Sequence, residues 1–211
     1  MIDYDKLKTA IGEIDDDTAM ALVDEVVQKG GDAAKAMEAC QAGMEVVGNL
    51  FETGEYFIGD LIAAGELMSA ALEKLRPLLA KDGTEELGQM ILCTVAGDIH
   101  DIGKNIVKAM MDTGGFEVID LGVDVSPQSI VSTAKEKGIK IVGLSGILTL
   151  AIDSMKDTVN AFKEAGLRDQ VKIIIGGNPV TAEVCSLVGA DSWSTNPQES
   201  VKICRGWATG G

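Results

Sequence analysis

The spacing of apolar positions follows a helical period from residue 1 to about residue 80. Apolar side chains recur there three or four positions apart, which places them on one face of a helix. Acidic residues that can cap helices precede two such stretches, at Asp15 to Asp17 and at Asp32, and Gly30-Gly31 and Gly54 can end them. A long helix then runs through Leu75, with Pro77 near its end. We expect a bundle of four helices in this part.

After a polar, glycine-containing stretch the pattern changes to short apolar runs that alternate with helical stretches. Continuous apolar runs of this length are typical of strands buried on both faces of a parallel sheet. The expected strands are residues 89–96, 116–122, 140–145 and 171–176, with a weak fifth at 191–194. The expected helices between and after them lie near residues 104–113, 126–137, 152–165, 179–188 and 197–208.

These two patterns predict an α/β protein in which a helical cap precedes a doubly wound, five-stranded parallel sheet of the Rossmann or flavodoxin-like type. The expected strand order is 2-1-3-4-5. The predicted domains are residues 1–81, a linker at 82–88, and residues 89–211.

Ligands of such sheets bind beyond the carboxyl ends of the strands, near the point where the strand order reverses. That point lies between the first and third strands, so three loops are expected to meet there. The loops are residues 97–103, 145–149 and 176–179. Ser145 can hydrogen-bond a ligand, and Gly176-Gly177 can let a bulky group lie against the backbone.

The loop after the first strand holds His100, the chain's one histidine, two residues beyond Asp98. In an extended loop the carboxylate can accept a hydrogen bond from one imidazole nitrogen, which makes the other nitrogen a better metal donor. One imidazole is too few ligands for a metal held by protein alone, but it suffices for a metal that arrives in a macrocycle. A phosphate loop is the alternative, although its spacing is one residue too long before Gly103-Lys104 and Asn105 replaces its hydroxyl.

Composition narrows the function classes. The chain has 211 residues and a net charge of −15, which disfavours nucleic acids and anionic membrane surfaces as partners. Its four cysteines form no close pair, so they indicate buried thiols in a reducing cytoplasm rather than a zinc site. Neither a signal peptide nor a stretch long enough to cross a bilayer is evident, and a cytoplasmic location is expected.

The motif Asp98-x-His100-x-x-Gly103, followed by Ser145 and later by Gly176-Gly177, resembles the cobalamin-binding signature. The segment GMEVVGNLFETGEYFIGDLIAAGELMSAAL, residues 43–72, is similar to the helical cap of corrinoid proteins from methyltransferase systems and of cobalamin-dependent methionine synthase. The resemblance covers nearly the whole chain. It implies a cobalamin or related corrinoid as cofactor.

The same resemblance implies roles for individual residues. His100 would be the lower axial cobalt ligand, and Asp98 would hydrogen-bond it. Phe51 and Ile58 would cover the upper, methyl-bearing face of the corrin. The remaining candidates would line the pocket of the cofactor's nucleotide tail or its displaced base: Asp101, Ile102, Gly103, Ser145, Ile147, Leu148, Thr149, Gly176 and Gly177.

One position departs from the family pattern. Methionine synthase has a hydroxyl six residues after the pocket serine, which extends the Asp–His pair. Ala151 stands at that position here. The relay from Asp98 is therefore expected to end at Thr149, at a water or at Asp98 itself.

The resemblance implies a methyl carrier that is not catalytic alone. A substrate methyltransferase would place a methyl group on Co(I), and a second methyltransferase would pass it to a tetrahydrofolate-type pterin or a thiol such as coenzyme M. A reductive activase is a further candidate partner. The linker is the expected hinge for movement of the cap. The methyl donor stays open among methoxylated aromatics, methylamines, methanol and glycine betaine.

Three other hypotheses remain at this point. The chain could be the small subunit of a radical mutase, which shares the motif around His100 but lacks the cap segment. It could be a cobalamin sensor that gates a partner, although no DNA-binding segment is visible. It could also be a nucleotide binder that uses the loop at residues 97–103 as a phosphate cradle.

Overall fold

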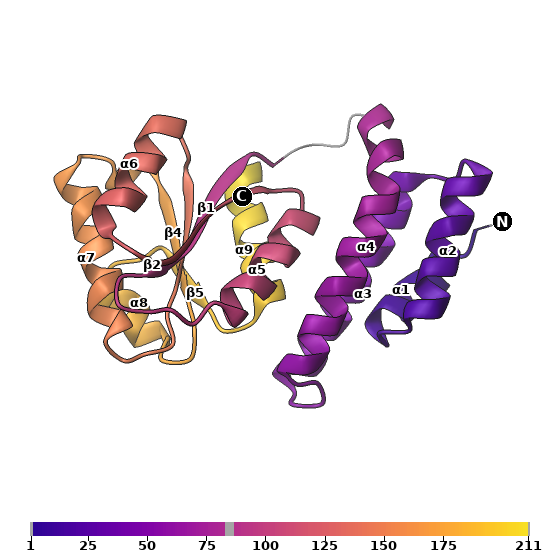
Figure 1. Cartoon of the computed structure of the whole chain (residues 1–211), viewed down its shortest axis with the longest axis horizontal. Helices are drawn as coiled ribbons and strands as arrows, with labels where there is room; N and C mark the ends of the chain where they lie inside the picture. Colours follow the sequence, from indigo (N-terminus) through magenta and orange to yellow (C-terminus); the bar gives the residue numbers. More distant parts are fainter. Residues whose placement is uncertain (1, 83–86, 211) are drawn as a thin grey trace. The chain divides into compact units, whose positions relative to one another are not determined.

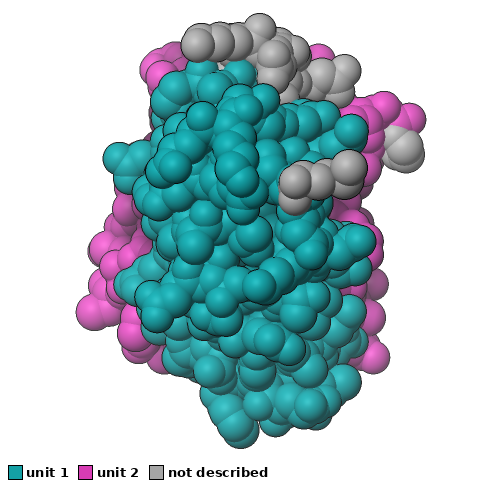
Figure 2. All heavy atoms as spheres, turned by 90° about the vertical axis from the view of Figure 1, so that its right-hand side faces the viewer, with its two compact units in different colours: residues 1–86 teal, residues 87–211 magenta. Residues whose placement is uncertain are grey.

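The computed structural model describes residues 2–82 and 87–210, which fall in two compact units at residues 1–86 and 87–211. Figure 2 colours the two units separately. Part of the predicted linker, residues 83–86, lies outside the described residues.

The described part of the first unit is a bundle of four helices, as the apolar spacing predicts (Figure 1). Buried Leu7, Ile11, Met44 and Met68 are among the side chains in its core. The helices are α1 Tyr4–Gly12, α2 Asp16–Lys29, α3 Ala33–Glu52 and α4 Ile58–Asp82.

Local sequence signals account for the helix ends in this unit. The Asp15 carboxylate accepts a hydrogen bond from the backbone N–H of Thr18 at 3.1 Å, and the Asp32 carboxylate accepts one from that of Lys35 at 3.0 Å. Such caps satisfy donors that have no partner within the helix. α4 continues through Pro77 to Asp82, beyond the end that the proline suggested.

The second unit is the predicted doubly wound sheet, and all its strand pairs are parallel, in the order β2-β1-β3-β4-β5. Helices α6, α7 and α8 cover one face, and α5 and α9 cover the other (Figure 1). The strands are β1 Gln89–Val95, β2 Glu117–Val125, β3 Ile141–Ser145, β4 Lys172–Gly176 and β5 Ser192–Ser194. The helices are α5 Ile102–Thr113, α6 Pro127–Lys137, α7 Ala151–Glu164, α8 Ala182–Val188 and α9 Pro197–Thr209, with a short 3-10 turn at Arg168–Gln170.

β2 is longer than the sequence suggested, because it runs past residue 122 to Val125. Two register shifts against β1 let Val125 pair with Val95. β2 is an edge strand with several exposed side chains, so its second half lacks the continuous apolar pattern of a buried strand.

The four cysteines are free and buried. Burial raises the pKa of the Cys40, Cys93 and Cys204 thiols to about 12. Thiols held in this way are inert packing groups, in line with the sequence-based interpretation. Within the part of the chain that the structure covers, no helix is both long and apolar enough to cross a bilayer.

Candidate functional site

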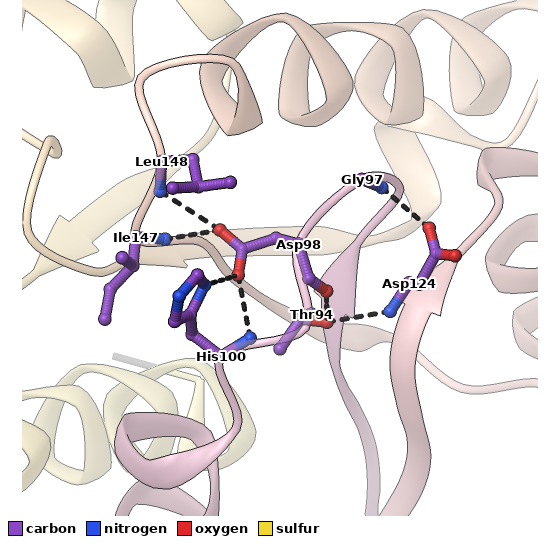
Figure 3. A network of polar contacts seen from close by, with 7 residues as sticks. All are labelled: Thr94, Gly97, Asp98, His100, Asp124, Ile147 and Leu148. Carbon is purple, nitrogen blue, oxygen red and sulfur yellow. Dashed lines mark hydrogen bonds and ion pairs between the residues drawn. The ribbon is translucent and has the colours of Figure 1, made fainter.

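The loop between β1 and α5 carries an Asp–His pair at the carboxyl edge of the sheet (Figure 3). The Asp98 side chain is fully buried, whereas 46% of the His100 side chain is exposed. One carboxylate oxygen of Asp98, Oδ1, lies 2.9 Å from His100 Nδ1 and also accepts the His100 backbone N–H at 2.9 Å. The expected pairing of these two residues is therefore present.

The second oxygen of Asp98 binds the loop between β3 and α7. Oδ2 accepts the backbone N–H groups of Ile147 at 2.7 Å and Leu148 at 3.1 Å (Figure 3). Burial by itself would raise the pKa of this carboxyl, but the N–H donors of His100, Leu148 and Ile147, joined by the imidazole, outweigh it and lower the pKa to about 2. Asp98 is therefore a carboxylate throughout the physiological pH range.

An ionised Asp98 fixes the tautomer of His100. Because the carboxylate only accepts hydrogen bonds, Nδ1 must carry a proton. Nε2 of the neutral ring then keeps its lone pair, and it makes no hydrogen bond to any residue that the structure describes. An exposed nitrogen with a free lone pair is a metal donor.

The three predicted loops do meet. The backbone N–H of Gly146, in the β3–α7 loop, donates to the Gly176 carbonyl at 3.0 Å. A Cβ atom on Gly177 would lie 1.8 Å from the carbonyl oxygen of Gly146, so these loops touch backbone to backbone. The structure thus gives the glycine pair a packing reason, and its contact with a cofactor tail stays a prediction.

Of the predicted ends of the relay from Asp98, the structure does not support Thr149. Thr149 is exposed and forms no hydrogen bond with the Asp98 carboxylate, whose second oxygen is bound by backbone N–H groups instead. Ala151, at the position of the family hydroxyl, is buried. The Ser145 hydroxyl is half-buried and has no hydrogen bond among the described residues, so it is available to a ligand.

The surroundings of His100 suit a large, flat, partly apolar group. Ile99, Ile102, Ile147, Leu148 and Leu150 are all exposed near the pair. A Cβ on Gly103, in the first turn of α5, would meet no heavy atom within 4 Å, so a ligand has room beside it. No group of three or more His, Cys, Asp or Glu side chains able to hold a metal occurs among the residues described. A metal that brings its equatorial ligands in a macrocycle fits this single imidazole.

Comparisons with known proteins agree with this geometry. Two B12 binding domain profiles match the chain, one at residues 88–201 and one at residues 4–76. A corrinoid protein of Desulfitobacterium hafniense is 37% identical over 203 residues, which cover 94% of each chain. This chain belongs to the corrinoid proteins of methyltransferase systems.

Two further relatives fit this membership of the corrinoid protein family. Trimethylamine corrinoid protein 1 of Methanosarcina acetivorans is 36% identical over 95% of this chain and 94% of its own. The crystal structure of a novel cobalamin-binding protein from Desulfitobacterium hafniense DCB-2 matches with 48% identity and a TM-score of 0.89, over 98% of this chain and 99% of that one. The cofactor of this corrinoid protein is cobalamin or a related corrinoid.

The predicted cap residues lie at the turn between α3 and α4. Phe51, near the end of α3, is half-buried, and Ile58, the first residue of α4, is 58% exposed. Phe57, which the sequence-based selection omitted, is 70% exposed. The sequence signal that could have identified Phe57 is an aromatic residue directly after the turn at Gly54.

The sequence-based selection also missed Thr94 and Asp124, which bind the backbone of the Asp98 loop (Figure 3). Asp124 is in β2, whose carboxyl end was not considered. An acidic residue near the end of a strand that neighbours β1 was the signal there. Asp101 and Ile102 are both exposed at the start of α5, as a ligand-contacting role requires.

Proposed function

We propose that this corrinoid protein carries methyl groups, with His100 Nε2 as the lower axial ligand of the corrinoid cobalt. The observation that carries the proposal is the imidazole itself: Nδ1 is held by the buried Asp98 carboxylate and the ring is half exposed. A bound corrinoid would supply cobalt chemistry for methyl transfer, while the protein binds it, orients it and excludes water.

We propose the following roles for the remaining site residues. Ser145 offers its hydroxyl to the nucleotide tail or to the displaced base, and Gly103 leaves space for that tail. Exposed Ile147 and Leu148 present apolar surface, while their backbone N–H groups hold Asp98. Further proposed contacts of the cofactor's tail are Thr149, in the β3–α7 loop, and the pair Gly176-Gly177, where β4 ends.

Phe51 and Ile58 in the helical unit are proposed to cover the upper face of the corrin. Ile58 is an exposed apolar side chain, which costs free energy in water unless a partner covers it. An apolar cover that excludes water would protect a reactive metal centre from side reactions. Covering the corrin during storage and exposing it during transfer requires that the helical unit move.

The proposed partners are a substrate methyltransferase and a second methyltransferase that delivers the methyl group to a pterin or thiol acceptor. The support is membership of a family whose relatives include a trimethylamine corrinoid protein. A reductive activase is a further proposed partner.

Two alternatives lose support from particular features. Lys104, which a phosphate cradle would need, is buried and binds the Asp120 carboxylate at 2.6 Å and the Asn105 side-chain oxygen at 2.7 Å. The small subunit of a radical mutase would not need the helical unit, yet residues 4–76 match a B12 binding domain profile of their own.

The test is the visible spectrum of the purified protein after incubation with hydroxocobalamin and removal of free cofactor. The parent is expected to retain a corrin spectrum. His100→Ala should retain roughly tenfold less cofactor, or hold it with an altered spectrum, because the axial nitrogen is gone. The proposal fails if the parent retains no corrin, or if the variant matches the parent in both retention and spectrum.

Phe51→Ala is expected to speed the oxidation of the bound corrin in its Co(I) state several-fold, because the truncated side chain excludes less water and oxygen. Absorbance after reduction measures the lifetime. Val27→Ala is a suitable control, since Val27 is exposed in the same unit but lies on α2. Equal lifetimes in parent and Phe51→Ala would contradict the role of Phe51 in the cover.

A further inference from the structure

Asp124, near the end of β2, has an unusual backbone. Its φ is 53°, and among the described residues only Ile14 is another non-glycine with positive φ. Positive φ is costly for most side chains, although Asp and Asn tolerate it better than others. Such a conformation beside a binding loop suggests that the position is held for a purpose.

The contacts of Asp124 explain the conformation. Its Oδ1 accepts the backbone N–H of Gly97 at 2.7 Å. Its own backbone N–H is shared between Thr94 Oγ1 at 2.9 Å and the Asp98 carbonyl at 3.0 Å. One residue at the end of β2 thus binds the backbone N–H of Gly97 and the backbone carbonyl of Asp98 (Figure 3).

Thr94 completes the arrangement from within the sheet. Its side chain is fully buried, and its Oγ1 donates to the Asp98 carbonyl at 2.5 Å. Asp98 is therefore fixed twice, through its backbone by Thr94 and Asp124, and through its carboxylate by the loop at Ile147 and Leu148. The His100 ring depends on the position of that carboxylate.

We propose that Asp124 is a positioning residue for His100, acting through the backbone N–H of Gly97 and the backbone carbonyl of Asp98. The proposal deepens the proposed function, because it rests on the axial role of His100. Gly97 has φ 80° and open space around its Cβ position, so this turn is held by hydrogen bonds: the Asp98 N–H donates to the Val95 carbonyl at 3.1 Å, and the Gly97 N–H donates to the Asp124 carboxylate at 2.7 Å. Without the Asp124 carboxylate the Gly97 N–H loses its partner, and the Asp98 carboxylate can shift away from Nδ1.

Two substitutions separate the carboxylate from the backbone conformation. Asp124→Gly keeps the positive φ and removes the acceptor for the Gly97 N–H. Asp124→Asn keeps both an oxygen acceptor and tolerance of positive φ, so it is the rescuing variant. Asp124 is exposed, so neither change opens a cavity, and thermal melting of each variant tests whether the fold is kept.

The first readout uses the apo-protein and the chain's single histidine. Long-range ¹H–¹⁵N spectra of the imidazole report one ring, so the Nδ1–H and Nε2–H tautomers are read without assignment. We expect the Nδ1–H pattern in the parent and in Asp124→Asn, and mixed tautomers in Asp124→Gly. Unchanged tautomers in Asp124→Gly, or an Asn variant that behaves like the Gly variant, would overturn the proposal.

The second readout is retention of hydroxocobalamin, with nitrogen hyperfine structure in the electron paramagnetic resonance spectrum of the Co(II) state. The protein carries ¹⁵N-labelled histidine, so coupling to His100 is distinguished from coupling to the ¹⁴N of the cofactor's own base. Asp124→Gly should bind the corrin roughly tenfold more weakly and show less nitrogen coupling, and Asp124→Asn should restore both. Parental coupling and retention in Asp124→Gly would overturn the proposal. If the parent itself shows no nitrogen coupling, the axial role of His100 fails, while the apo spectra still decide whether Asp124 orients the ring.

Discussion

Asp98→Asn is expected either to weaken ligation by His100 or to open the loop that binds Asp98, while leaving the sheet folded. The carboxylate accepts two N–H groups on each oxygen. An amide has one oxygen, so its NH₂ group must face either His100 or the N–H groups of Ile147 and Leu148. If it faces His100, the ring accepts at Nδ1 and carries its proton on Nε2, where no lone pair remains for cobalt. If it faces the loop, the amide oxygen still accepts the Nδ1 proton, but the NH₂ group meets the N–H groups of Ile147 and Leu148, so the loop separates from residue 98.

Either orientation also lowers stability. Loss of charge-assisted hydrogen bonds from a buried group should reduce the free energy of unfolding of the apo-protein by about 3 kcal/mol. Chemical denaturation measures this loss, and the Co(II) spectrum with bound corrin measures ligation. A variant with parental stability and parental nitrogen coupling would contradict the assigned role of Asp98.

The pH dependence of stability gives an independent check on Asp98. Its pKa is about 2 in the folded protein, against about 3.9 in an unfolded chain. A depressed pKa contributes stability above the unfolded value, here about 2 kcal/mol. That contribution should disappear as the pH falls from about 4 to about 2, and Asp98→Asn should lack this component of acid unfolding. An identical acid transition in both proteins would contradict it.

Gly177→Ala is expected to prevent stable folding of the sheet unit. The new Cβ would lie 1.8 Å from the Gly146 carbonyl oxygen, and the residue has φ 122°, which side chains rarely adopt. The clash joins a Cβ, which cannot rotate away from its backbone, to a backbone oxygen. It can be removed only by separating the β3–α7 loop from the β4–α8 loop. We expect the free energy of unfolding to fall by more than about 4 kcal/mol. The variant should then be insoluble or show no cooperative thermal transition.

Gly103→Ala is the matched control for this prediction. Its Cβ meets nothing within 4 Å, and the residue lies in helix α5, so the apo-protein should be as stable as the parent or more stable by at most about 1 kcal/mol. If the space beside Gly103 holds the cofactor's tail, the same variant should retain less hydroxocobalamin. A Gly177→Ala protein that melts like the parent would contradict the close packing of the two loops.

Much of this protein follows from the sequence alone. The change from a helical spacing to short apolar runs predicts the four-helix unit and the parallel sheet. A helix that buries one face has apolar residues three or four positions apart, whereas a strand buried on both faces is apolar at nearly every position. Asp15 and Asp32 were identifiable as helix caps from local chemistry. The pairing of Asp98 with His100 was predictable because the two residues are close in sequence and share one loop.

The tertiary structure decided what depends on contacts between distant segments. The second oxygen of Asp98 binds backbone N–H groups of Ile147 and Leu148, and a sequence does not display which backbone donors face a given carboxylate. The Thr149 hydroxyl, one predicted end of the relay, is therefore not needed to bind this oxygen. The proposed role of Asp124 also could not be read from the sequence, because it depends on β2 lying beside β1 and on a backbone angle that its side chain tolerates. Residue types give the chemistry of a loop, whereas the packing of strands decides which groups that chemistry meets.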